Sequence, residues 1–146
     1  SQIPNDKFLH LVEQDDTDLA KALKRFDVSH IFGVDGGRLD HQIGTFFALI
    51  ESGSNAIVHF DKWCGVRIPK SGRTIKLNQG SIVSLFAFGK VEEIQSSGLA
   101  YGFDNQNLEP GTRGIHNEAI SDEVFVKCGN GELVMLWSIE SELEQK

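Results

Sequence analysis

The class of the fold is decided by the stretch from Val28 to His41, which runs Val-Ser-His-Ile-Phe-Gly-Val-Asp-Gly-Gly-Arg-Leu-Asp-His. Its first half, up to Val34, is an apolar run of strand length that stops at paired glycines. A helix is expected from about Arg38 to Glu51, and Gly53 is expected to cap its end. The apolar side of this helix is expected to comprise Leu39, Ile43, Phe46, Phe47 and Ile50. A strand that turns through glycines into an amphipathic helix is typical of an α/β sheet.

Strand and helix alternate on both sides of this stretch. Phe8 to Val12 is a short apolar run, and the polar residues at 15–17 are good N-caps for a helix that follows it. The apolar residues at helical spacing in that helix are Leu19, Ala22, Leu23 and Phe26. Asn55 to Phe60 supplies a third strand. This order predicts a parallel sheet with right-handed crossovers.

The pattern changes near Lys62, after which there is no further periodic segment of helix length. Short apolar or alternating runs separated by turn residues occur instead, at 66–69, 74–77, 81–88, 91–96, 124–127 and 133–139. Many short strands with regular turns predict a β-sandwich or barrel. We therefore expect two domains, a partial Rossmann-like α/β domain at residues 1–63 and a β-sandwich at residues 64–146.

Composition narrows the function. The 146 residues are 40% hydrophobic and 24% charged, which is ordinary globular composition, and the net charge is −7. An acidic surface argues against nucleic acid or an anionic membrane as a partner, and no apolar run approaches the roughly 18 residues of a membrane span. Cys64 and Cys128 have no zinc-site spacing, and their scarcity suits a reducing, cytoplasmic location.

The glycine turn has residues suited to phosphate chemistry. Gly36 and Gly37 allow the backbone to approach a ligand, and Arg38 has the two-pronged geometry that grips phosphate. Asp40 is a candidate to bind a metal ion or to orient a nucleophile. A tight turn followed by a salt-bridged first helical turn explains the same residues. The segment matches neither the P-loop nor the dinucleotide-binding glycine pattern.

A second polar segment occupies the equivalent place after the first strand: Gln14-Asp15-Asp16-Thr17-Asp18. Hard oxygen ligands of this kind suit Mg²⁺. Acidic residues that favour a helix N-terminus explain the segment equally simply. Two such segments at consecutive strand ends of one sheet favour a shared metal–phosphate site.

The remaining chemically interesting side chains have simpler explanations. His10, His30 and His59 lie in expected strands and are predicted to be structural. The aromatic residues Trp63, Tyr101 and Trp137 are core or interface candidates, and one of them is suited to stack on a flat heteroaromatic ligand.

Five segments in order resemble the thiamine pyrophosphokinase family. The first is the Thr-Asp segment at 15–23, and the second, Gly36 to His41, resembles the family pattern Gly-Gly-Arg-x-Asp-His. The third, at 80–85, resembles a strand of the family's thiamine-binding domain. The other two, at 97–101 and 114–118, resemble its Gly-Leu-x-(Trp/Tyr) and Gly-x-Ser-Asn-Glu motifs. Together they span about residues 12 to 140.

The resemblance implies transfer of diphosphate from ATP to the hydroxyl of thiamine, with Mg²⁺, in a homodimer whose active sites form across the subunit interface. It implies metal-binding and catalytic roles for Asp18 and Asp40, with Gln14 as a further metal ligand. ATP contacts are implied for Thr17, Gly36, Gly37 and Arg38. The implied thiamine pocket comprises Tyr101, His116 and Asn117.

Two departures from the family pattern leave a second hypothesis open. The family's Gly-Asp-x-Asp-Ser segment is absent, so the sequence is expected to start after it, and His116 stands where the family has serine. The alternative is therefore a thiamine-binding fragment or module without turnover. A nucleotide-sugar or pterin enzyme that shares only the α/β half is disfavoured by the two motifs at 97–101 and 114–118.

Overall fold

A computed structural model describes residues 7–10, 16–34 and 38–141. It divides into two compact units, unit 1 at Ser1–Arg67 and unit 2 at Ile68–Lys146, and each is described by itself. Among the described residues, neither helix is long and apolar enough to cross a membrane.

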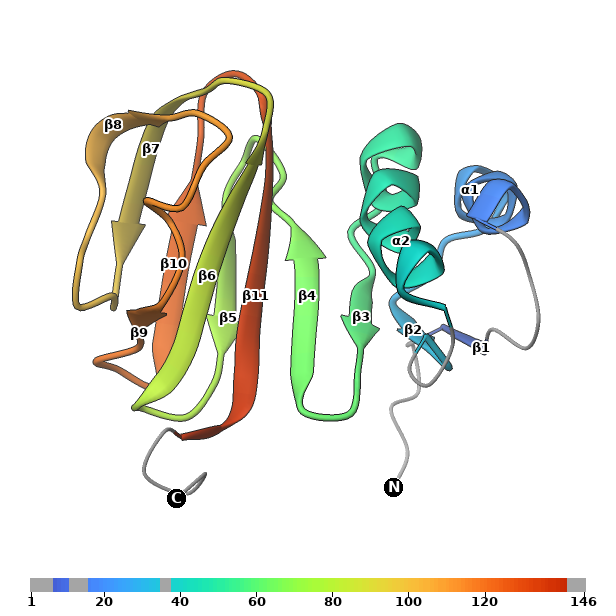
Figure 1. The fold of residues 1–146 in the computed structure, drawn as a ribbon, viewed down its shortest axis with the longest axis horizontal. Helices are drawn as coiled ribbons and strands as arrows, with labels where there is room; N and C mark the ends of the chain where they lie inside the picture. Colours follow the sequence, from blue (N-terminus) through green and yellow to red (C-terminus); the bar gives the residue numbers. More distant parts are fainter. Residues whose placement is uncertain (1–6, 11–15, 35–37, 142–146) are drawn as a thin grey trace. The chain divides into compact units, whose positions relative to one another are not determined.

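Unit 1 alternates strands and helices, as expected from its sequence (Figure 1). Its elements are β1 (Phe8–His10), α1 (Asp16–Arg25), β2 (His30–Phe32), α2 (Leu39–Ser52), β3 (Ile57–His59) and β4 (Trp63–Arg67). Strands β1, β2 and β3 are parallel neighbours in that order. Strand β4 pairs antiparallel with β3, opposing Gly65 to Val58, and so turns the chain back at the end of the parallel sheet.

The core of unit 1 shows which face of each helix is buried. Leu19 and Leu23 of α1 and Leu49 of α2 pack with the inward residues of the strands, such as Ile31 and Val58. The expected apolar side of α2 is partly wrong, because Leu39, Ile43 and Phe47 are 70%, 50% and 52% exposed. The buried residues of α2 are Thr45, Ala48 and Leu49. Thr45 and Ala48 are small and let this face of the helix approach its neighbours closely, while Leu49 fills the core.

The ends of the two helices also follow from local residues. Gly53 adopts a left-handed conformation with φ of 67°, and its N–H caps the carbonyl of Ile50, as expected for a glycine C-cap. Helix α1 ends at Arg25, so Phe26 lies beyond it and is 59% exposed rather than packed at helical spacing.

The described part of unit 2, residues 68–141, is built from antiparallel strands and contains no helix. They are β5 (Arg73–Lys76), β6 (Ser81–Phe88), β7 (Val91–Ser97), β8 (Asp104–Leu108), β9 (Asn117–Glu118), β10 (Glu123–Lys127) and β11 (Glu132–Ser141). One sheet has the order β11-β6-β9 and lies over the other, which has the order β5-β10-β7-β8 (Figure 1). The strands expected at 81–88, 91–96 and 124–127 are present.

Two strands of unit 2 lie where no strand was expected. Strand β8 exposes its first four residues and buries only Leu108, so it lacks the alternation that predicts a strand. Strand β9 has two residues and pairs with Ile82 and Val83 of β6. Of the candidate thiamine residues, His116 lies in the loop between these two strands, Asn117 is the first residue of β9, and Tyr101 precedes β8.

Candidate functional site

The N-termini of α1 and α2 lie at one edge of the unit 1 sheet. Each helix follows a strand, α1 after β1 and α2 after β2, and these strands are parallel neighbours. The carboxyl ends of adjacent parallel strands share an edge, which is where α/β sheets bind ligands. This topology is consistent with Asp18 and Asp40 lying at the same edge, and both side chains are exposed.

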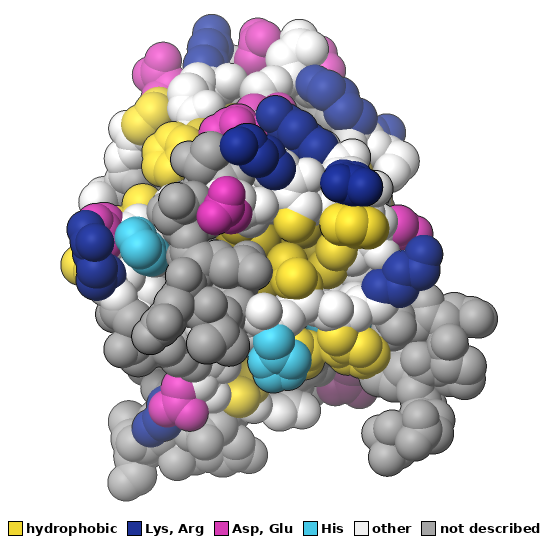
Figure 2. Space-filling model, turned by 90° about the vertical axis from the view of Figure 1, so that its right-hand side faces the viewer, with side chains coloured by type: hydrophobic (Ala, Val, Ile, Leu, Met, Phe, Trp, Pro, Cys, Tyr) yellow, Lys and Arg dark blue, Asp and Glu magenta, His cyan; other side chains and the backbone are white. Residues whose placement is uncertain are grey.

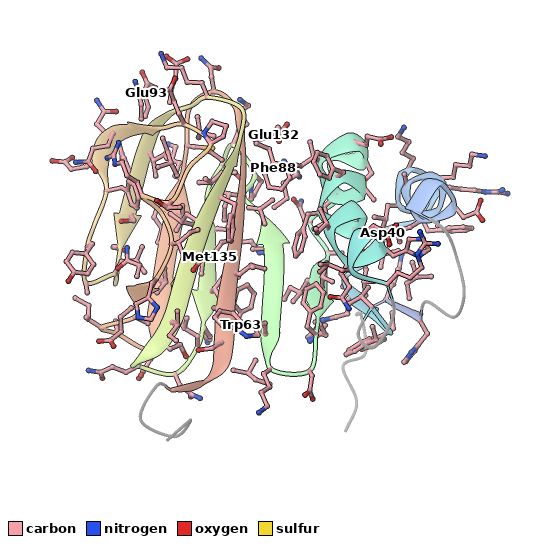
Figure 3. The ribbon with its side chains drawn as sticks, in the orientation of Figure 1. Asp40, Trp63, Phe88, Glu93, Glu132 and Met135 are labelled. Atoms are coloured by element: carbon pink, nitrogen blue, oxygen red, sulfur yellow. The ribbon has the colours of Figure 1, made fainter. Side chains whose placement is uncertain are left out.

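Arg38 and Asp40 are joined at the start of α2, where Figure 3 labels Asp40. Arg38 donates from Nε to Asp40 Oδ1 at 3.1 Å and from Nη2 to Oδ2 at 2.6 Å. The backbone N–H of His41 also donates to Asp40 Oδ1, at 3.0 Å. The hydrogen bonds and charge of Arg38 lower the pKa of Asp40, so this carboxylate is ionised at neutral pH. The edge of the Arg38 guanidinium that was predicted to bind phosphate is thus occupied by Asp40.

Only some of the residues predicted to bind metal or ATP can be placed in the structure. Gln14, Gly36 and Gly37 lie outside the described residues, and Thr17 is described only as part of α1. Within the described part of the chain, no group of three or more His, Cys, Asp or Glu side chains is placed to hold a metal ion. The carboxylates of Asp18 and Asp40 are hard oxygen donors that suit Mg²⁺, but they do not make a complete ligand set.

In unit 2 the segments 97–101 and 114–120 lie side by side. Ala100 N donates to Glu118 O at 2.9 Å, and Ile120 N donates to Gly98 O at 2.8 Å. Gly98 has φ of 87°, and a Cβ there would collide with the carbonyl of Glu123. Gly114 has no room for a Cβ either, because Leu85 O occupies that space. The glycines of both motifs are therefore required by close backbone contacts.

Asn117 joins these two segments through its side chain. It is 6% exposed, and its Oδ1 accepts from the backbone N–H of Tyr101 at 2.9 Å and of Glu118 at 2.9 Å. Its Nδ2 donates to Tyr101 O at 2.7 Å. Tyr101, by contrast, is 75% exposed. The buried amide thus holds the backbone of an exposed aromatic residue.

His116 is held by a buried hydroxyl that the sequence did not single out. It is an exposed residue in the left-handed conformation, with φ of 65°, and its N–H donates to Ser84 Oγ at 3.1 Å. Ser84 is 6% exposed and lies in β6. The sequence signals at Ser84 were its place in the segment 80–85, which resembles a strand of the family, and its position in the middle of an apolar run.

Three histidines of unit 1, His10, His30 and His59, belong to an aromatic layer. The rings of Phe8, His30, Phe32 and His59 stack in succession, with Phe32 and His59 centroids 4.3 Å apart. His30 Nδ1 lies 2.9 Å from His59 Nε2, and His59 Nδ1 lies 3.6 Å from Cys64 Sγ. Burial and the neighbouring His30 lower the pKa of His59, while burial raises that of Cys64 to about 11. Cys64 is therefore a protonated thiol and not a nucleophile.

Two hollows lie away from these residues. One, of about 260 Å³, is lined by Ala20, Lys21, Lys24, Gly44, Phe47, Ala48 and Glu51 of the two helices. Figure 2 shows lysine and arginine side chains beside hydrophobic ones on this face. The other, of about 380 Å³, is lined by Lys90 and six residues of the segment 107–113. Neither hollow includes any candidate site residue.

A family model described as "Thiamin pyrophosphokinase, vitamin B1 binding domain" matches residues 55–133. The match covers both segments that meet at Asn117. It also includes β3 and β4, so it begins before the start of unit 2.

Known proteins similar to this chain are longer than it. A protein from Caenorhabditis elegans, Thiamin pyrophosphokinase 1, is 28% identical over 157 residues, which cover 94% of this chain and 63% of that protein. A solved thiamine pyrophosphokinase from Bacillus subtilis superposes with a TM-score of 0.71 at 24% identity, covering 85% of this chain and 61% of that one. A thiamin pyrophosphokinase family protein from Enterococcus faecalis gives 0.71 at 18% identity, covering 90% and 66%. The chain thus spans less than two thirds of the length of these relatives.

Proposed function

The chain belongs to the thiamin pyrophosphokinase family, and from this premise we propose that it acts in the transfer of diphosphate from ATP to thiamine. In this reaction the hydroxyl oxygen of thiamine bonds to the β-phosphorus of ATP while the bond from that phosphorus to the AMP oxygen breaks. The products are thiamine diphosphate and AMP, and the hydroxyl proton is released. The enzyme is accordingly a thiamine diphosphokinase, a transferase.

The observation that carries this proposal is the family match over residues 55–133 together with the pairing of the two motif segments inside it. The pairing leaves Tyr101 75% exposed beside Asn117. An exposed aromatic ring suits the cationic thiazolium of thiamine, because cation–π attraction contributes about 0.5–2 kcal/mol. We assign Tyr101 and His116 to the thiamine pocket, with Asn117 beside them.

Unit 1 takes the role of a partial Rossmann-like catalytic domain in this proposal. Asp18 and Asp40 lie at the ligand-binding edge of its parallel strands, and Arg38 has the geometry to bind a phosphate in place of Asp40. Mg²⁺ bound here would neutralise phosphate charge. Gly36, Gly37, Thr17 and Gln14 remain proposed contacts to ATP and metal. Most of the catalysis then comes from placing the hydroxyl in line and neutralising charge.

Assembly and location complete the proposal. Tyr101, Ile115 and Ile120 are 75%, 42% and 54% exposed in the motif segments, and a homodimer with active sites across the interface would cover them. We place the protein in the cytoplasm because neither Cys64 nor Cys128 is part of a disulfide among the described residues, which suits a reducing compartment.

The test combines two measurements on the same protein: calorimetry with thiamine, and release of AMP with and without thiamine. Binding of thiamine together with thiamine-dependent AMP release supports the full proposal. Binding without AMP release supports the alternative of a thiamine-binding chain without turnover. An absence of thiamine binding contradicts both.

A further inference from the structure

We propose that Asn117 is a positioning residue, which acts on the ligand only through Tyr101. The inference rests on the proposed function, because thiamine is the ligand that the ring of Tyr101 would meet. In this proposal the Asn117 amide does not contact thiamine. The buried amide holds the backbone of Tyr101, and the exposed ring of Tyr101 contacts thiamine.

The amide of Asn117 has little capacity left for a ligand. Two backbone N–H groups, from Tyr101 and Glu118, occupy the acceptor Oδ1, and the carbonyl of Tyr101 takes one hydrogen of Nδ2. The three partners also fix the orientation of the amide, since a flipped amide would point its NH₂ at two N–H donors. One N–H at most remains for a ligand, and Asn117 is only 6% exposed.

Tyr101 depends on this amide because the backbone pairing stops just before it. Leu99 bridges Ala119, and Ala100 N donates to Glu118 O, so the chain up to Ala100 is paired with backbone. At Tyr101 both the N–H and the C=O bond to the side chain of Asn117 instead. The amide therefore continues the pairing by one residue, and it sets the direction in which the exposed Tyr101 ring points.

A double-mutant cycle separates this role from direct contact with thiamine. The variants are Asn117→Ala, Tyr101→Ala and the double variant, with thiamine affinity measured by calorimetry. Loss of the ring should weaken binding by about 2- to 30-fold, the range expected of a cation–π contact. If Asn117 acts through Tyr101, Asn117→Ala should approach the same loss, and the double variant should bind no more weakly than Tyr101→Ala.

Asn107 offers a matched control in the same unit. Its Oδ1 accepts from the backbone N–H of Glu93 at 3.2 Å, so it also caps backbone, but it lies in β8 and does not bond to Tyr101. Asn107→Ala should leave thiamine affinity unchanged. Asn117→Asp keeps the acceptor oxygen and loses the donor to Tyr101 O, so it should fall between wild type and Asn117→Ala, and it serves if the alanine variant does not fold.

Hydrogen exchange at the backbone amide of Tyr101 gives a second measurement, which distinguishes loss of the Asn117 hydrogen bond from a general loss of stability. The amide of Tyr101 should exchange at least about tenfold faster in Asn117→Ala than in Asn107→Ala, because its buried acceptor is gone. Additive losses in the cycle, or unchanged exchange at Tyr101, overturn the inference while leaving the proposed function standing. If the unmodified protein binds no thiamine, the proposed function fails and this inference fails with it.

Discussion

In unit 1 the candidate residues with described side chains, Asp18, Arg38 and Asp40, all lie at the surface, and Arg38 and Asp40 bind each other. In unit 2 the exposed Tyr101 and His116 are each anchored at the backbone by a buried side chain, Asn117 or Ser84. The two units thus place their candidate residues by different means. An exposed ion pair contributes roughly 0–1 kcal/mol to stability, whereas losing one partner of a buried hydrogen bond costs about 1–3 kcal/mol.

In unit 1 the candidate residues contribute little to folding stability, whereas in unit 2 the contacts that hold the candidate residues also stabilise the fold. The charged groups of unit 1 are available to exchange partners when a ligand arrives, because little folding energy depends on their pairing. The binding surface of unit 2 is set by the same contacts that hold its strands together. Changes in unit 1 should therefore affect turnover before stability, and changes in unit 2 should affect both.

The largest expected effect is that of Asp40→Asn on turnover. If Asp40 binds metal or orients the reacting groups, thiamine-dependent AMP release by the enzyme should fall by about 100-fold or more. The midpoint of thermal unfolding and the affinity for thiamine should change little, because Asp40 is exposed and lies in unit 1. Arg38→Lys should also reduce AMP release, since lysine keeps the charge without the two-pronged geometry. Near-wild-type rates for both variants would remove the site from unit 1.

The next largest effect is on folding stability, when alanine replaces one of two glycines with left-handed backbones, one in each unit. Gly53 has open space around an added Cβ, so Gly53→Ala should cost about 1–2 kcal/mol for the left-handed conformation alone. Gly98→Ala adds a collision with the carbonyl of Glu123, which should cost about 1–3 kcal/mol more.

Urea denaturation measures both losses as free energies of unfolding. Trp137 is buried in unit 2, so its fluorescence in a Trp63→Phe background follows the unit that contains Gly98. The helical circular dichroism band follows unit 1, which contains Gly53. Thiamine affinity should fall with Gly98→Ala and stay constant with Gly53→Ala. Equal losses of stability at the two positions would mean that the contact at Glu123 relaxes freely.

Much of the fold was predictable because its elements bury a regular face. The run from Ser81 to Phe88 was predicted as a strand and is β6, and the glycine that ends α2 was predicted at position 53. Strand β8 was missed because its side chains are polar and exposed. The outward apolar side of α2 could not be told from its inward side, since Leu39 and Leu49 are the same residue type in different surroundings.

The candidate site was predictable as a set of residues but not as a set of contacts. The motif at 114–118 implied that Asn117 lines the thiamine pocket, but it did not reveal that the amide bonds to the backbone of Tyr101. Side-chain direction at Asn117 depends on the pairing of segments 16 residues apart, which no local pattern encodes. For the same reason Ser84, which supports His116 from 32 residues away, was not singled out.

The smallest expected effect is on the stability of unit 1 in mild acid. Burial and the neighbouring His30 lower the pKa of His59 below 6.5, so the unfolded chain binds a proton at this residue more readily than the folded one. The stability present above pH 6.5 should therefore be lost as the pH falls from 6.5 through the lowered pKa of His59. Urea denaturation at about pH 7.5 and about pH 5.5, followed by the helical circular dichroism band, should show the loss.

Two variants of the aromatic layer test whether His59 is the cause. His30→Phe keeps a ring in the stack but removes one of the two causes of the lowered pKa, so the pH dependence should shrink without vanishing, because burial of His59 remains. His10→Phe is the matched control, since His10 stacks on Phe32 at 5.4 Å and is not a cause of the shift at His59. Both helices of the described chain lie in unit 1, so the helical band reports the unit that contains His59. An equal pH dependence in the wild type and in His30→Phe would assign the acid sensitivity to groups other than this pair.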